Sequence, residues 1–117
     1  MPAYNFKKQF ANDVESGKKC QTVRPKRKRP TVAGDTLYLY TGMRTKNCRK
    51  LKEAECEVVV PIDIGLFFVR VDNEDLSLEE IEEFAKDDGF ENMGEMFSFF
   101  NKHYELPLYD TMELIEW

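Results

Sequence analysis

Long apolar runs and histidine are nearly absent from this sequence. No run of about 18 apolar residues occurs, so no membrane-spanning helix is expected. The first ten residues, MPAYNFKKQF, contain no apolar core of the secretory type, so we expect a cytoplasmic protein. The one histidine, His103, falls near the end of a predicted helix, where a cation is favourable without any catalytic role.

Cysteine is also scarce. The three cysteines, Cys20, Cys48 and Cys56, form neither an even set nor a C-x-x-C pair. This pattern favours reduced intracellular thiols over disulfides. Without clustered Asp, His and Cys ligands, we expect no metal and no other cofactor. For Cys48, next to the cation Arg49, we favour an ordinary thiol over a reactive thiolate.

Aromatic and aliphatic residues are plentiful. The chain has 117 residues, of which 42% are hydrophobic, and its aromatics comprise 9 Phe, 5 Tyr and 1 Trp. That length suits a single domain with one core, so we expect residues 1–117 to form one domain. The composition is typical of a folded protein and not of a disordered tail.

The charges are divided between the two halves of the chain. Residues 1–52 contain 14 Lys and Arg but only three acids, a net charge of +11. Residues 53–117 contain three Lys and Arg and 19 acids, a net charge of -16. One interpretation is that the halves neutralise each other within the fold, and another is that the basic half binds an anionic partner.

The segment Gly17–Arg29, GKKCQTVRPKRKR, concentrates the positive charge. Five of the six residues 24–29 are cations. Like charges repel, and a fold gains little from grouping them, so we predict a site for an anionic, nucleotide-like ligand. The candidate ligand-binding cations are Lys18, Arg24, Lys26, Arg27, Lys28 and Arg29. Tyr38 and Tyr40 are further candidates, because aromatic rings stack on bases beside basic loops.

Hydrophobic spacing predicts three helices. Phe6, Phe10 and Val14 recur every four residues, which indicates a helix over residues 4–16 that ends at Gly17. Capping patterns at Ser77-x-x-Glu80 and Asn92-x-x-Glu95 open helices over about 78–87 and 93–103.

Alternating and continuous apolar patterns predict the strands. The expected ranges are 20–24, 36–40, 52–64, 66–71 and 111–117, with a basic loop over 41–50. In the first strand, Cys20, Thr22 and Arg24 share one face. Strands of uneven length with helices inserted between them favour an α+β barrel over a βαβ series.

A family resemblance rests on two motifs. The pattern Gly17-Lys18-Lys19-x-x-Thr22-x-Arg24, followed by Gly34-Asp35, resembles the G-x-K-x-x-T-x-R…G-D core of the ASCH-domain family. The segment Asp88-Gly89-Phe90-Glu91-Asn92 is similar to the C-terminal part of that family. The resemblance implies a PUA-like β-barrel with inserted helices, a fold associated with RNA binding, and a cleft lined by the first motif.

One branch of the family consists of small amidohydrolases that deacetylate N4-acetylcytidine through a Lys, a Thr and a Glu. By resemblance, the catalytic residues here would be Lys19, Thr22 and Glu91. Thr hydroxyls need a neighbouring base, and Lys19 would serve if burial and nearby cations lower its pKa. Glu91 is also explained as an ordinary acid near a helix N-terminus.

Three functions therefore remain open from the sequence. The first is a module that binds RNA, a nucleotide or a nucleoside in a basic cleft. The second is a hydrolase of an acylated nucleoside. The third is a protein-interaction module whose basic half contacts an acidic partner.

Overall fold

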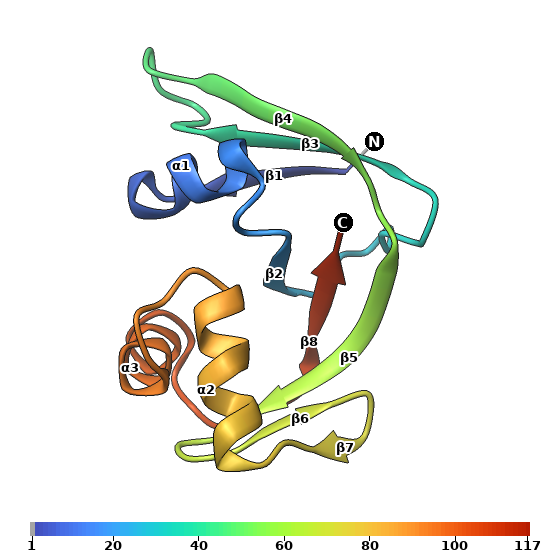
Figure 1. The fold of residues 1–117 in the computed structure, drawn as a ribbon. Coiled ribbons are helices and arrows are strands. Elements are labelled where there is room, and N and C mark those ends of the chain that lie inside the picture. Colours follow the sequence, from blue (N-terminus) through green and yellow to red (C-terminus); the bar gives the residue numbers. More distant parts are fainter. Residues whose placement is uncertain (1) are drawn as a thin grey trace.

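The computed structural model describes residues 2–117 and confirms the predicted α+β class (Figure 1). The predicted helices near 78–87 and 93–103 are confirmed, as is the Ser77–Glu80 capping box. In chain order the elements are β1 (Ala3–Phe6), α1 (Lys8–Ser16), β2 (Gln21–Pro25), β3 (Thr36–Thr41), β4 (Arg49–Glu55), β5 (Val58–Ile64), β6 (Val69–Val71), β7 (Glu74–Asp75), α2 (Leu78–Asp87), α3 (Met93–Tyr104) and β8 (Leu108–Glu116).

The strands pair into two sheets, and both are open within residues 2–117. One sheet has the order β1-β3-β4, and the other has the order β2-β8-β5-β6-β7. Figure 1 shows β4 leading directly into β5, so that one curved path connects the two sheets. None of the helices in the described chain is long and apolar enough to cross a membrane.

The predicted helix over residues 4–16 is wrong at its start. Residues 3–6 form β1, which pairs in parallel with β3, and the helix begins only at Lys8. Tyr4 and Phe6 are buried while Asn5 is exposed, which is the period of two of a strand. The four-residue spacing of Phe6 and Phe10 fitted a helix equally well, and pairing with β3 decided between the two.

The predicted strand over residues 52–64 is two strands. The chain leaves the first sheet after β4 and enters the second at β5, and Cys56 lies buried at the corner. There the amide of Cys56 donates to the carbonyl of Asp35 at 2.8 Å. The other predicted strands shift at their ends: β6 begins at Val69, β8 begins at Leu108, and β4 extends into the expected basic loop.

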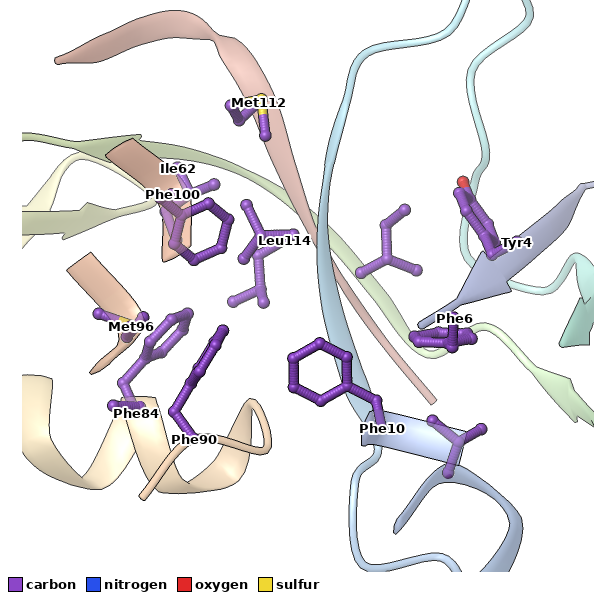
Figure 2. Close-up of a cluster of buried hydrophobic side chains, with 14 of the residues drawn as sticks. Tyr4, Phe6, Phe10, Ile62, Phe84, Phe90, Met96, Phe100, Met112 and Leu114 are labelled. Carbon is purple, nitrogen blue, oxygen red and sulfur yellow. The ribbon is translucent and has the colours of Figure 1, made fainter. Parts of the chain in front are cut away.

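Buried side chains fill the space on both sides of β2 (Figure 2). Tyr4 and Phe6 from β1 lie on one side, and Met96 and Phe100 from α3 lie on the other, where Leu114 of β8 joins them. The first three residues of β2 are buried, so the start of the strand is held by contacts from several elements.

Candidate ligand-binding site

A cleft of about 250 Å³ opens beside β2. Strand β2 contributes Thr22 and Arg24, and Lys19 precedes the strand. The remaining walls come from β1, α1, the turn after α2, and α3. The cleft is lined by Asn5, Phe6, Lys7, Phe10, Lys19, Thr22, Val23, Arg24, Asp88, Phe90, Phe99, Phe100 and Tyr104.

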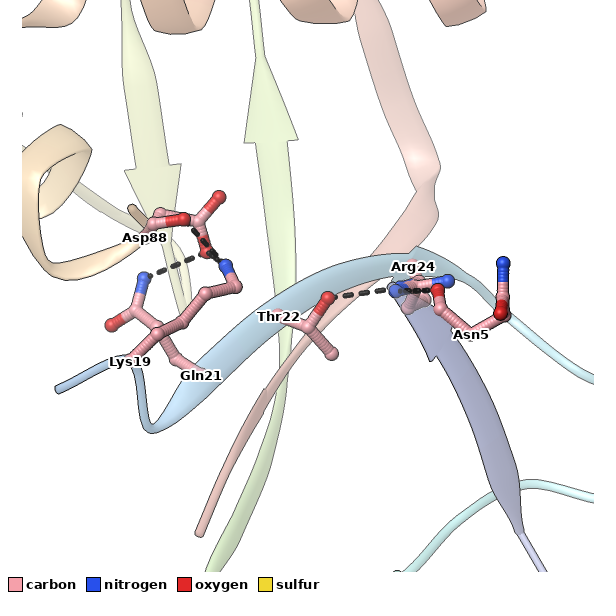
Figure 3. Close-up of polar contacts among 6 residues, drawn as sticks. All are labelled: Asn5, Lys19, Gln21, Thr22, Arg24 and Asp88. Atoms are coloured by element: carbon pink, nitrogen blue, oxygen red, sulfur yellow. Dashed lines mark hydrogen bonds and ion pairs between the residues drawn. The ribbon is translucent and has the colours of Figure 1, made fainter. Parts of the chain in front are cut away.

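Lys19 forms a buried ion pair with Asp88 (Figure 3). Lys19 Nζ lies 3.1 Å from Asp88 Oδ1 and also donates to the backbone carbonyl of Asp88, and both side chains are less than 5% exposed. The side-chain amide of Gln21 donates to the same carboxylate oxygen at 3.3 Å. Burial lowers the pKa of Lys19, and the attraction of Asp88 opposes that shift.

Arg24 is a half-buried cation without a carboxylate partner within residues 2–117. Its Nε donates to Thr22 Oγ1 at 2.9 Å, and Nη2 donates to the carbonyl of Asn5 at 2.6 Å (Figure 3). A guanidinium has five N–H donors, so donors remain for a ligand. Burial lowers the pKa of Arg24, but arginine stays charged at neutral pH. The cleft thus holds a cation whose charge no acid of the described chain neutralises through an ion pair.

Aromatic rings form another part of the cleft wall. Phe10 of α1 lies edge-on to Phe90 with ring centroids 5.3 Å apart, and edge-on to Phe99 at 5.7 Å. The centroids of Phe90 and Phe99 are 5.2 Å apart. These ring contacts pack the phenylalanines of the wall against one another.

Residues of the basic run, 24–29, line two different depressions. The guanidinium of Arg24 lies 5.5 Å from the centroid of the Tyr4 ring, and that of Arg27 lies 4.0 Å from the same centroid. Arg27, Lys28 and Arg29 line a second depression of about 610 Å³. The run therefore contributes residues to two depressions, and the guanidinium groups of Arg24 at one and Arg27 at the other both lie over the ring of Tyr4.

The structure brings some predicted site residues together and leaves others apart. Lys19, Thr22 and Arg24 line the cleft. Lys18, Lys26 and Glu91 are exposed, and none of the three lines it. Tyr38 and Tyr40 are half-buried on β3, likewise outside the cleft. Of the three predicted catalytic residues, Lys19 and Thr22 therefore lie in the cleft, whereas the exposed Glu91 does not line it.

Sequence reasoning missed the role of Asp88 as the partner of Lys19. Asp88 belongs to the motif Asp88-Gly89-Phe90-Glu91-Asn92, but the family resemblance points to Glu91, three residues later, as the functional acid. A signal was present in Gly89, because a glycine directly after an acid at a helix end marks a sharp turn that can direct the acid inward. The backbone confirms this turn: Gly89 has φ 97°, and the Phe90 amide donates to the Ala85 carbonyl at 2.9 Å.

Gly89→Ala is expected to lower the free energy of unfolding by about 1–3 kcal/mol, because an alanine is strained at this φ. An added Cβ would also lie 2.8 Å from Phe10 Cδ1. Gly34→Ala is the matched control, since Gly34 has φ 95° but open space around it. Urea unfolding of both variants measures the difference. Equal losses would show that Phe10 yields to the added methyl group.

Comparisons with protein-family models, with curated proteins and with solved structures find no match. Within residues 2–117 no cluster of His, Cys, Asp and Glu could hold a metal ion, and all three cysteines are free. The function must therefore be argued from the cleft.

Proposed function

We propose that the protein binds RNA, a nucleotide or a nucleoside in the cleft beside β2, as a PUA-like ASCH domain would. One observation carries the proposal: Arg24 lines this cleft half-buried, without an ion-pair partner among residues 2–117, and the cleft is also lined by phenylalanines. Buried charges are normally paired, so Arg24 favours an anionic or carbonyl-bearing ligand. Aromatic walls favour a flat base, because every base has a π-face.

The dimensions of the cleft narrow the class of ligand. At about 250 Å³ it is smaller than the roughly 300–1,000 Å³ of sites for drug-sized molecules. One base or nucleoside suits this volume. A longer strand would continue over the depression lined by Arg27, Lys28 and Arg29, where phosphates would meet cations.

The PUA-like barrel belongs to the same proposal. The two open sheets share the curved path from β4 into β5, and the core lies between them and the helices. Two sheets joined by one curved path around a common core are consistent with the PUA-like barrel that we propose.

A second candidate is hydrolysis of an acylated nucleoside. The lowered pKa of Lys19 and the presence of Thr22 in the same cleft favour it. Two contacts weigh against it: Lys19 Nζ is held by Asp88, and the Thr22 hydroxyl accepts a hydrogen bond from Arg24. With Glu91 exposed as well, binding is the better-supported function.

The test is a titration of isotope-labelled protein with cytidine, CMP and single-stranded RNA of about ten nucleotides. We expect amide shifts at Thr22, Phe90 and Phe99, and the tightest binding for RNA. Replacing Lys26, Arg27 and Lys28 by alanine is expected to flatten the salt dependence of RNA binding by up to about one unit per lost phosphate contact. Lys50→Ala, in the basic region of β4, is the control.

The same samples decide between the two candidates. Release of acetate from N4-acetylcytidine, lost in Lys19→Ala and Thr22→Ala, would make the protein a hydrolase. No shift in the cleft up to about 1 mM of any ligand, equivalent to binding weaker than about 4 kcal/mol, would refute the proposal. Unchanged salt dependence in the triple variant would mean that the loop does not contact phosphates.

A further inference from the structure

An apolar groove of about 410 Å³ is lined by residues of the acidic half of the chain, 53–117, and shares no lining residue with the ligand cleft. It lies where the start of α2, one face of α3, and the turn between β5 and β6 meet. Its large apolar residues are Leu66, Phe67, Leu78, Met93, Phe97 and Leu106.

The groove contains three of the five exposed large hydrophobic residues of the described chain. Phe67 is 84% exposed, Leu78 66% and Leu66 54%. Only Val32 and Tyr109 are comparable large hydrophobic residues in the rest of the described chain. Single exposed apolar residues are ordinary, whereas three around one groove mark an interaction surface.

Acidic residues are neighbours of the groove residues, by contact or in the sequence. Glu82 lies one turn after Leu78, and its carboxylate accepts a hydrogen bond from the Met93 amide at 3.2 Å. Glu79 and Glu105 are exposed and directly follow or precede groove residues in the chain.

Glu95 is exposed in the first turn of α3, next to the lining residue Gly94. Among the sequence neighbours of the lining residues, the acids Glu79, Glu95 and Glu105 outnumber the single cation, Lys102, which follows Asn101. A segment that fills the groove would thus meet mainly negative charge, which favours a basic partner.

The same charges argue against two other occupants. A membrane surface with anionic headgroups would be repelled. A second copy pairing groove to groove would place acids against acids. A second copy using its basic half would offer only Val32 as an exposed large apolar residue in residues 2–52.

We propose that this groove docks a basic amphipathic helix of a partner protein. Apolar side chains at i, i+4 and i+7 of that helix would fill the groove around Phe67 and Leu78, and its lysines or arginines would face Glu79, Glu82 and Glu105. The surface is separate from the ligand cleft, because Met93 and Phe97 line the groove whereas Phe99 and Phe100 line the cleft.

The probe is a designed helical peptide of about 16 residues, since shorter helices are marginal in water. It carries Leu and Phe at i, i+4 and i+7 and Lys at the other positions, and a matched peptide carries Glu instead of Lys. In a titration of the whole protein we expect amide shifts at Phe67, Leu78 and Phe97. Affinity should fall with salt, and the Glu peptide should not bind.

Phe67→Ser is expected to lower the affinity for the Lys peptide by at least about tenfold, because exposed aromatic anchors dominate such interfaces. It should leave CMP binding at the cleft unchanged. Val32→Ser, on the basic half, is the matched control and should bind the peptide normally. Glu79→Gln with Glu105→Gln should reduce the salt dependence without abolishing binding.

Four results would overturn the proposal. They are no binding of the Lys peptide, equal binding of the Glu peptide, shifts confined to other surfaces, and unchanged affinity in Phe67→Ser. Sedimentation of the protein alone tests whether a second copy of the chain occupies the groove instead. Self-association that Phe67→Ser abolishes would assign the groove to a second copy and refute a partner helix.

Discussion

Replacing Asp88 by alanine is expected to lower the free energy of unfolding by about 3–5 kcal/mol, because it leaves the Lys19 cation without its counter-charge in a buried site. Lys19 and Asp88 are each 3% exposed. The ammonium lies 5.0 Å from the centroid of Phe10 and 5.9 Å from that of Phe6, contacts that do not replace a carboxylate. Urea unfolding at pH 7 measures the loss.

The double variant Lys19→Met with Asp88→Leu is the informative control. Replacing both members of a buried ion pair by apolar residues is often neutral for stability, so most of the loss should be recovered. The double variant should nevertheless bind nucleotide more weakly, since two polar residues that line the cleft become apolar. A loss below about 1 kcal/mol in Asp88→Ala would mean that the backbone carbonyl of residue 88 satisfies Lys19 alone.

Arg24→Gln is expected to weaken CMP binding by about 2 kcal/mol or more, roughly 30-fold, because a charge-assisted contact in a half-buried site is lost. Cytidine binding should change far less if Arg24 contacts the phosphate. Isothermal titration with both ligands measures the two affinities.

Arg24→Lys and Lys28→Gln complete the comparison for Arg24. Lysine keeps the charge but lacks the planar fork, so it should recover only part of the CMP affinity. Lys28→Gln removes an exposed loop cation near the second depression and should leave the binding of single nucleotides unchanged. An equal loss for CMP and cytidine would show that Arg24 reads the base or the sugar and not the phosphate.

The sequence by itself determined the elements that local chemistry specifies. Ser77 and Glu80 cap α2, Asn92 accepts from the Glu95 amide at 2.8 Å, and Gly17 ends α1 with φ 86°. The alternation of residues 36–40 predicted β3 correctly, with Leu37 and Leu39 buried. Caps, turns and alternation act within a few residues, so the sequence alone carries them.

Other features were decided only by the tertiary structure. Residues 3–6 became a strand because β3 supplied a parallel partner. Residues of the basic run line two depressions, and at the second the guanidinium of Arg27 lies over the Tyr4 ring and donates to the Ala3 carbonyl.

Asp88, and not Glu91, became the partner of Lys19, 69 positions away in the chain. The turn at Gly89 directs one acid inward and leaves the other exposed. Contacts over such separations depend on how sheets and helices meet, and neither spacing nor composition encodes that arrangement.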